Sequence, residues 1–113
     1  MPVGVVEERG GKAVVLHLTG VFDAAHADST AAHLHRAIAG MPPPPLVVVV
    51  LSGLDLLAAA GIHVLGRFAR SCAQRGVRVA AVLDGALRSV VEFAVRRSML
   101  VFATVDEALA GCG

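Results

Sequence analysis

The amino-acid sequence predicts an α/β fold, a mostly parallel β-sheet covered by helices, in a single domain over residues 1–113. The chain has 113 residues, of which 56% are hydrophobic, and this length suits one domain with one core. Its β-rich segments are unbroken aliphatic runs, as in strands that are buried on both faces of a sheet. These runs alternate with segments of helical periodicity, which implies parallel strands joined by crossover helices.

The first two strands are predicted to form a hairpin. Residues 3–8 and 13–20 are rich in residues that favour strands. Residues 9–12, RGGK, separate them and supply the glycines that a tight turn uses. The chain therefore begins with an antiparallel pair.

A helix is predicted over residues 23–39. Asp23 is a favourable N-cap residue. Gly40 and the four prolines at 42–45 predict the end of this helix and a stiff lead-in to the next strand. The apolar residues that recur at helical spacing and form one stripe are Ala27, Ala31, Leu34 and Ile38.

The rest of the chain alternates strands with single helices. Residues 46–51, LVVVVL, predict a fully buried strand, and residues 59–74 predict an amphipathic helix. A strand over 77–83, a helix over 86–96 and a short strand over 100–103 follow.

The last helix is predicted to open with a capping box. Thr104 and Glu107 are spaced so that the hydroxyl and the carboxylate satisfy opposite backbone amides. The complete predicted order is therefore β-β-α-β-α-β-α-β-α.

Composition argues against a membrane protein and against a nucleic-acid-binding protein. The longest apolar stretch, residues 46–65, is interrupted by polar residues and glycines, so strand, turn and helix fit it better than a membrane span. Residues 1–20 lack the basic start and apolar block of a secretory signal. The net charge is +1, without a basic tract. We therefore expect a cytoplasmic protein with neither a membrane nor nucleic acid as a direct partner.

No enzyme, metal site or cofactor is expected from the motifs. The sequence has no glycine-rich phosphate loop, no Ser/His/Asp grouping with a plausible nucleophile elbow and no paired carboxylates placed in one turn. His26 and His33 are seven residues apart, about 10 Å along a helix, which is too far for one zinc ion. Tryptophan and tyrosine are absent, and Phe68 and Phe93 are predicted on helix faces toward the core.

The two cysteines leave two interpretations open. Cys72 falls on the apolar helix face, where a buried thiol behaves as a small hydrophobic group. Structural disulfides are rare in cytoplasmic proteins. The alternative is a redox switch in which Cys112, near the C-terminus, reaches Cys72 or another chain.

Three segments of the chain resemble the STAS domain family, the small α/β fold of bacterial anti-sigma factor antagonists and of sulfate-transporter tails. They are LHLTGVFDAAHA, VVVVLSGLDLLAAAGIHVLGRF and MLVFATVDEALAG. The resemblance covers nearly the whole chain. It implies the STAS fold over residues 1–113.

The middle segment is the most specific, and it departs from the family pattern. Relatives commonly carry Asp-Leu-Ser-Gly, a short spacer and Asp-Ser-Ser-Gly-Leu. Ser52 and Gly53 match the first part, and Gly61 matches the second. The two aspartates of the pattern fall on Val50 and Ala58.

The position that a partner kinase phosphorylates in relatives falls on Ala60, whereas Asp23 matches the family's loop aspartate. Alanine has no oxygen, so phosphorylation cannot switch this position off. The resemblance implies an anti-sigma factor antagonist that binds an anti-sigma factor kinase of the Bergerat fold and releases a sigma factor, without that switch. Its implied partner-binding residues are Asp23, Ser52, Ala58, Ala59, Ala60, Gly61, His63 and Arg67.

Periodicity of the helix over 59–74 supports a partner-binding surface. Its polar side carries His63, Arg67, Arg70 and Gln74. Two alternatives stay open: a turn that has decayed into packing, since alanine favours helices, and an accessory or scaffold STAS subunit of a sensory complex or a lipid-transport ATPase. A homodimer is compatible with all of these.

Overall fold

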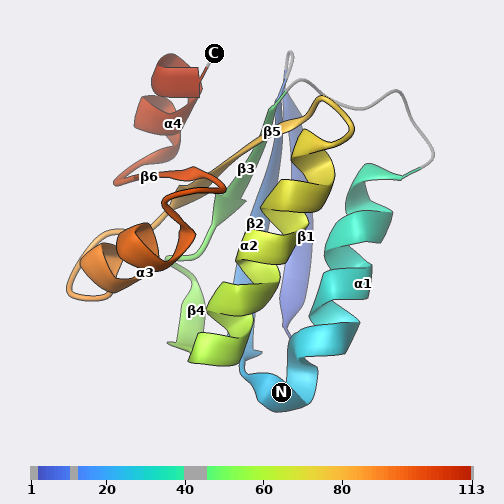
Figure 1. The fold of residues 1–113 in the computed structure, drawn as a ribbon, viewed down its shortest axis with the longest axis vertical. Coiled ribbons are helices and arrows are strands. Elements are labelled where there is room, and N and C mark those ends of the chain that lie inside the picture. The colour runs from blue at the N-terminus through green and yellow to red at the C-terminus, as the bar shows by residue number, and fades with distance from the viewer. Residues whose placement is uncertain (1–2, 11–12, 40–45, 113) are drawn as a thin grey trace.

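The computed structural model describes residues 3–10, 13–39 and 46–112. Its strands are β1 (Gly4–Gly10), β2 (Ala13–Phe22), β3 (Leu46–Val50), β4 (Leu54–Leu57), β5 (Arg78–Val82) and β6 (Leu100–Phe102). Its helices are the 3-10 helix η1 (Ala24–His26), α1 (Ala27–Ile38), α2 (Ala59–Ala73), α3 (Arg88–Val95) and α4 (Val105–Cys112). Figure 1 shows these elements from the side of α1, α2 and α3.

The strands form one mixed sheet in the order β1-β2-β3-β5-β6. Among the described strands, β1 and β2 are the one antiparallel pair, with Gly10 opposite Ala13. The predicted hairpin is confirmed by this pairing, although turn residues 11–12 lie outside the described residues. The first predicted helix ends at Ile38, one residue before the predicted end at residue 39, whereas the glycine and the proline lead-in of residues 40–45 lie outside the described residues.

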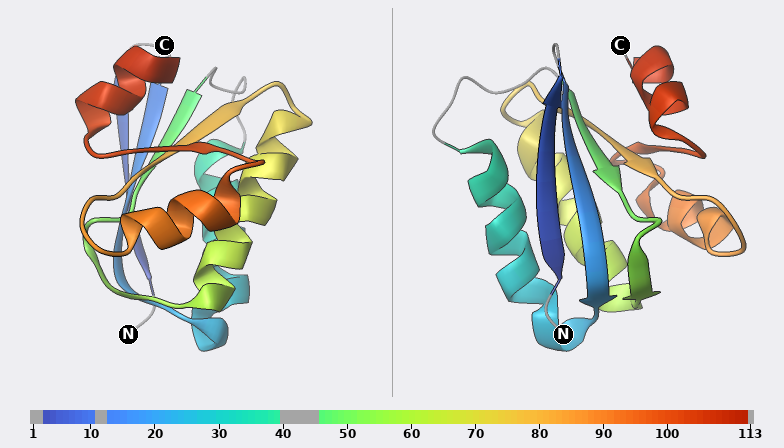
Figure 2. Two further views of the ribbon diagram at one scale, coloured as in Figure 1. Left: turned by 60° about the vertical axis from the view of Figure 1, so that its left-hand side comes forward. Right: turned by 180° about the vertical axis from the view of Figure 1, so that it is seen from behind.

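Helices cover the two faces of the sheet unequally. α1, α2 and α3 pack on one face, and α4 packs on the other (Figures 1 and 2). The main core joins Leu34, Phe68 and Val91 of these three helices to Leu16 and Val49 of the strands. A smaller cluster lies under Ala108 of α4. The predicted α/β architecture is therefore confirmed.

β4 was not predicted. After β3 the chain turns at Leu51, Ser52 and Gly53 and then pairs again with β2, now with its last residues from Gly20 to Phe22. Gly53 allows this return because a Cβ there would lie 2.9 Å from the carbonyl oxygen of Leu18. The long strand β2 therefore holds β3 and β4 one after the other on the same side.

The caps at the helix starts agree with the sequence. Asp23 accepts a hydrogen bond from the backbone N–H of His26, 3.2 Å away, but it caps η1, which precedes α1. At α4, the N–H of Glu107 donates to Thr104 Oγ1 at 3.1 Å. The Glu107 carboxylate reaches back to the N–H of Ala103 at 3.2 Å. The capping box is therefore present, with the return bond one residue earlier than expected.

The prediction that Phe93 faces the core is wrong. Phe93 is 69% exposed, whereas Phe68 is buried as predicted. The core side of α3 is carried by Val91 and Val95. Phe93 is two residues from Val91, about 200° around a helix, so it points to the opposite side.

We expect Thr104→Ala to lower the free energy of unfolding by about 1 kcal/mol, because the N–H of Glu107 loses its acceptor. Urea denaturation followed by circular dichroism measures this change. Thr104→Ser keeps the hydroxyl and should retain most of the stability. Equal losses in both variants would show that the hydroxyl does not cap α4.

Candidate functional site

The end of β2 and the first turn of α2 meet at one corner of the molecule. The N–H of Ala58 donates to the carbonyl oxygen of Phe22 at 2.9 Å. Gly61 packs against the same residue, because a Cβ there would lie 2.8 Å from that oxygen and 2.9 Å from the phenyl ring. Asp23 follows Phe22 directly, so the loop aspartate and the start of α2 are neighbours (Figure 1).

Asp23 is a fixed, ionised group at this corner. Its Oδ1 lies 2.8 Å from Nδ1 of His26 and also accepts the His26 backbone N–H. Burial alone would raise the pKa of Asp23, but the hydrogen bonds and charge of His26 outweigh burial and lower it. The carboxylate is about one third exposed. The corner therefore carries a negative charge in a set position.

The start of α2 carries methyl groups where a polar cap is usual. Ala58 is the N-cap residue, and within the described chain no side chain caps this end and no acidic residue occupies the first turn. Ala59 is exposed and Ala60 is half-buried. The corner defined by Asp23, His26 and Ala58–Gly61 offers a surface for contact but supplies no nucleophile.

Ser52 does not belong to this corner. It is exposed in the turn before β4, and Ala58 follows the end of β4. A strand of four residues spans about 13 Å. The structure thus gathers Asp23 and Ala58–Gly61 and leaves Ser52 at the other end of β4.

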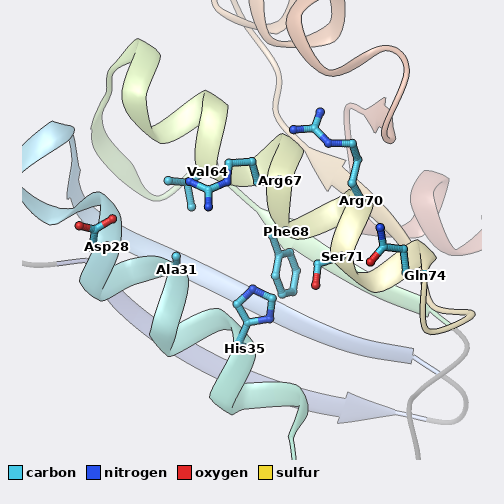
Figure 3. Close-up of a pocket in the computed structure, with 9 residues that line it drawn as sticks. All are labelled: Asp28, Ala31, His35, Val64, Arg67, Phe68, Arg70, Ser71 and Gln74. Carbon is cyan, nitrogen blue, oxygen red and sulfur yellow. The ribbon is translucent and has the colours of Figure 1, made fainter.

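His63 and Arg67 lie on two sides of α2. Arg67 lines a groove between α1 and α2 of about 400 Å³, with His35 packed edge-on against Phe68 at a centroid distance of 5.2 Å. In Figure 3, Arg70 points away from the centre of this groove. His63 instead lines a groove between α2 and α3. The predicted cationic face therefore divides between two grooves.

The groove between α2 and α3 was missed by the sequence reasoning. Its volume is about 310 Å³, and it shares Ala59 and His63 with the start of α2. Two exposed apolar side chains belong to α3: Val90, which lines the groove, and Phe93, three residues further along the helix and outside the lining. The lining residues are Ala59, Ile62, His63, Gly66, Arg70, Val90 and Ala94. The sequence does contain one signal that could have predicted this groove. Leu87, Val90 and Ala94 recur at helical spacing and form a second apolar stripe along α3 and its N-cap.

Cys72 is buried in the main core, as its position on the apolar face predicts. Burial raises the pKa of its thiol from 9.0 to about 11, although Arg75 partly opposes this shift. The side chain of Cys112 lies outside the described residues. A pairing of the two cysteines therefore stays a prediction.

The described parts of the chain also bear on metal binding and membrane insertion. There, histidine, cysteine, aspartate and glutamate do not gather in groups of three that suit a metal ion. None of the described helices is long and apolar enough to cross a membrane.

The fold is that of a STAS domain, and the chain belongs to the STAS domain family, whose model matches residues 5–108. Over 67 residues the chain is 36% identical to the anti-sigma-F factor antagonist RsfA of Mycobacterium tuberculosis. That match covers 59% of this chain and 52% of RsfA, so it spans about half of the relative's length.

Solved structures share the fold. An anti-sigma factor antagonist from Mycobacterium paratuberculosis superposes with a TM-score of 0.77 at 19% identity, covering 97% of this chain and 93% of that one. The Bacillus cell fate determinant SpoIIAA in its phosphorylated form gives a TM-score of 0.66 at 19% identity, covering 96% and 98%.

Two glycines of α2 should respond in opposite ways to alanine. Gly61→Ala should lower the free energy of unfolding by about 1–3 kcal/mol, because the new methyl group collides with the Phe22 backbone. Gly66→Ala is the matched control, since a Cβ there meets Arg70 Nη1 at 3.9 Å and nothing closer outside its own helix. Its higher helix propensity should add about 0.5–1 kcal/mol. Urea denaturation measures both, and equal effects would contradict this packing account.

We expect the Cys72 thiol to react at least about 100-fold more slowly with a thiolate-specific reagent in the folded protein than in guanidinium. Its raised pKa alone reduces the thiolate fraction by roughly this factor near neutral pH. A Cys112→Ser background isolates the Cys72 signal. Fast labelling of the folded variant would mean that the core opens readily around α2.

Proposed function

We propose that this chain is an anti-sigma factor antagonist that binds a kinase-type anti-sigma factor and thereby releases a sigma factor. The identity to the antagonist RsfA carries this proposal. The corner supports it, because an ionised Asp23 beside an uncapped helix start is an accessible surface for contact with a protein.

The proposed antagonist stays in its binding-competent state. In the family pattern, residue 60 is the phosphorylated position, and here it is an alanine. Phosphorylation would add about −1.5 to −2 charges close to Asp23. A methyl group resembles the small, uncharged side chain of the unphosphorylated form, so release from the partner would depend on another signal.

A binding measurement with the purified Bergerat-fold anti-sigma factors of the source bacterium tests this function. We expect one of them to bind the wild-type chain and Ala60→Asp to weaken that binding at least about 10-fold. A carboxylate at residue 60 adds a second negative charge to the corner that already carries Asp23, at the surface that would contact the partner. Calorimetry measures the affinity.

Ala110→Asp, on exposed α4, is the matched control and should bind like the wild type. Incubation with the kinase and labelled ATP should leave the wild-type chain unmodified. If none of these anti-sigma factors binds, and transporter or scaffold subunits are captured instead, the antagonist function is wrong.

A further inference from the structure

Small residues make up much of the lining of the groove between α2 and α3. Ala59, Gly66 and Ala94 line it together with Ile62 and Val90. Small residues at a helix surface leave space that a bulky side chain of another helix can fill. The groove is therefore shaped to receive a protruding apolar side chain.

Gly66 is unexplained by the packing of the chain itself. A glycine in the middle of a helix costs about 0.5–1 kcal/mol relative to alanine. Gly61 is required by its contact with Phe22, but a Cβ on Gly66 would meet only Arg70 Nη1, at 3.9 Å. Gly66 is buried and lines the groove, so its missing side chain leaves open space there.

The rim of the groove is basic on α2, and α3 carries exposed apolar side chains, of which Val90 lines the groove and Phe93 lies beyond its lining. Val90 and Phe93 are among the most exposed large apolar side chains of the described chain. The guanidinium of Arg96 lies 4.2 Å from the centre of the Phe93 ring and also donates to the Phe93 carbonyl, which holds this side chain in place. His63 and Arg70 line the α2 side, and none of the described lining residues is acidic.

These features favour a helical occupant over an extended one. The groove runs between two helices whose backbone groups are already hydrogen-bonded, so it offers no strand edge to an extended peptide. An amphipathic helix satisfies its own backbone and presents apolar anchors along one side. The cationic rim complements acidic residues on that helix.

We propose that the α2–α3 groove receives an amphipathic helix of the anti-sigma factor, which places an apolar side chain over Gly66, packs against Phe93 and turns acidic residues toward His63 and Arg70. This inference rests on the proposed function, because it concerns the same partner. Ala59 and His63 join the groove to the corner at Asp23, so one partner can cover both.

The test uses the anti-sigma factor that binds the wild-type chain. Phe93→Ala should weaken binding about 30-fold, the loss typical of an aromatic anchor at an interface. Gly66→Leu should weaken binding at least as much, because the leucine side chain fills the space in the groove that the partner's apolar side chain would occupy. Arg70→Gln should weaken binding less and reduce its dependence on salt.

Matched controls separate the groove from general effects. Val6→Ala removes an apolar side chain that is 60% exposed, against 69% for Phe93, from β1 at the far edge of the sheet, and Ala73→Leu places the same leucine side chain two turns further along α2. Both should bind like the wild type. Circular dichroism and thermal unfolding verify that every variant is folded. If Gly66→Leu does not fold, the binding of Phe93→Ala alone decides the test.

The outcomes distinguish the two proposals. If the wild type binds and Ala60→Asp weakens binding, but the groove variants bind like the wild type, the groove proposal is overturned and the proposed function stands. If the wild type binds no anti-sigma factor, the proposed function falls and the groove proposal falls with it. A dimer of the chain alone that Phe93→Ala dissociates would assign the groove to a second copy and overturn the proposal.

Discussion

The carbonyl oxygen of Phe22 is the contact on which the arrangement of this molecule depends. It ends β2, accepts the N–H of Ala58 and touches Gly61, so one atom fixes both the start of α2 and its distance from the sheet. Asp23 is the next residue, and its carboxylate is aimed by η1 rather than by α2. The Asp23 carboxylate is therefore positioned by η1 and the start of α2 by the carbonyl of Phe22, the residue that directly precedes Asp23.

Gly53 and Gly61 are subject to a steric constraint that does not govern the alanines at residues 58 and 60. Gly53 and Gly61 each approach a backbone oxygen of β2 more closely than any side chain permits, so the fold itself demands them. Residues 58 and 60 are alanines in this chain. The glycines thus set the backbone geometry of this corner independently of the side chains at residues 58 and 60.

Much of the fold follows from local patterns in the sequence, because unbroken aliphatic runs and helical stripes predict buried strands and crossover helices. β4 could not be found this way, since its four residues become a strand only through pairing with the end of β2. Phe93 was misplaced because the core contact of α3 is narrow and rests on Val91 and Val95. The groove between α2 and α3 depends on which helices become neighbours, which a local pattern does not contain.

The parallel strands give the molecule two unlike ends. β2 and β4 both finish at the corner, and β1 begins near it, with Gly4 opposite Thr19, whereas α4 lies at the opposite extreme of the molecule (Figures 1 and 2). A domain or surface attached behind Cys112 leaves the corner facing solution. An attachment ahead of β1 stands beside Asp23, so the choice of terminus decides whether a large neighbour and a docking protein compete for the same space.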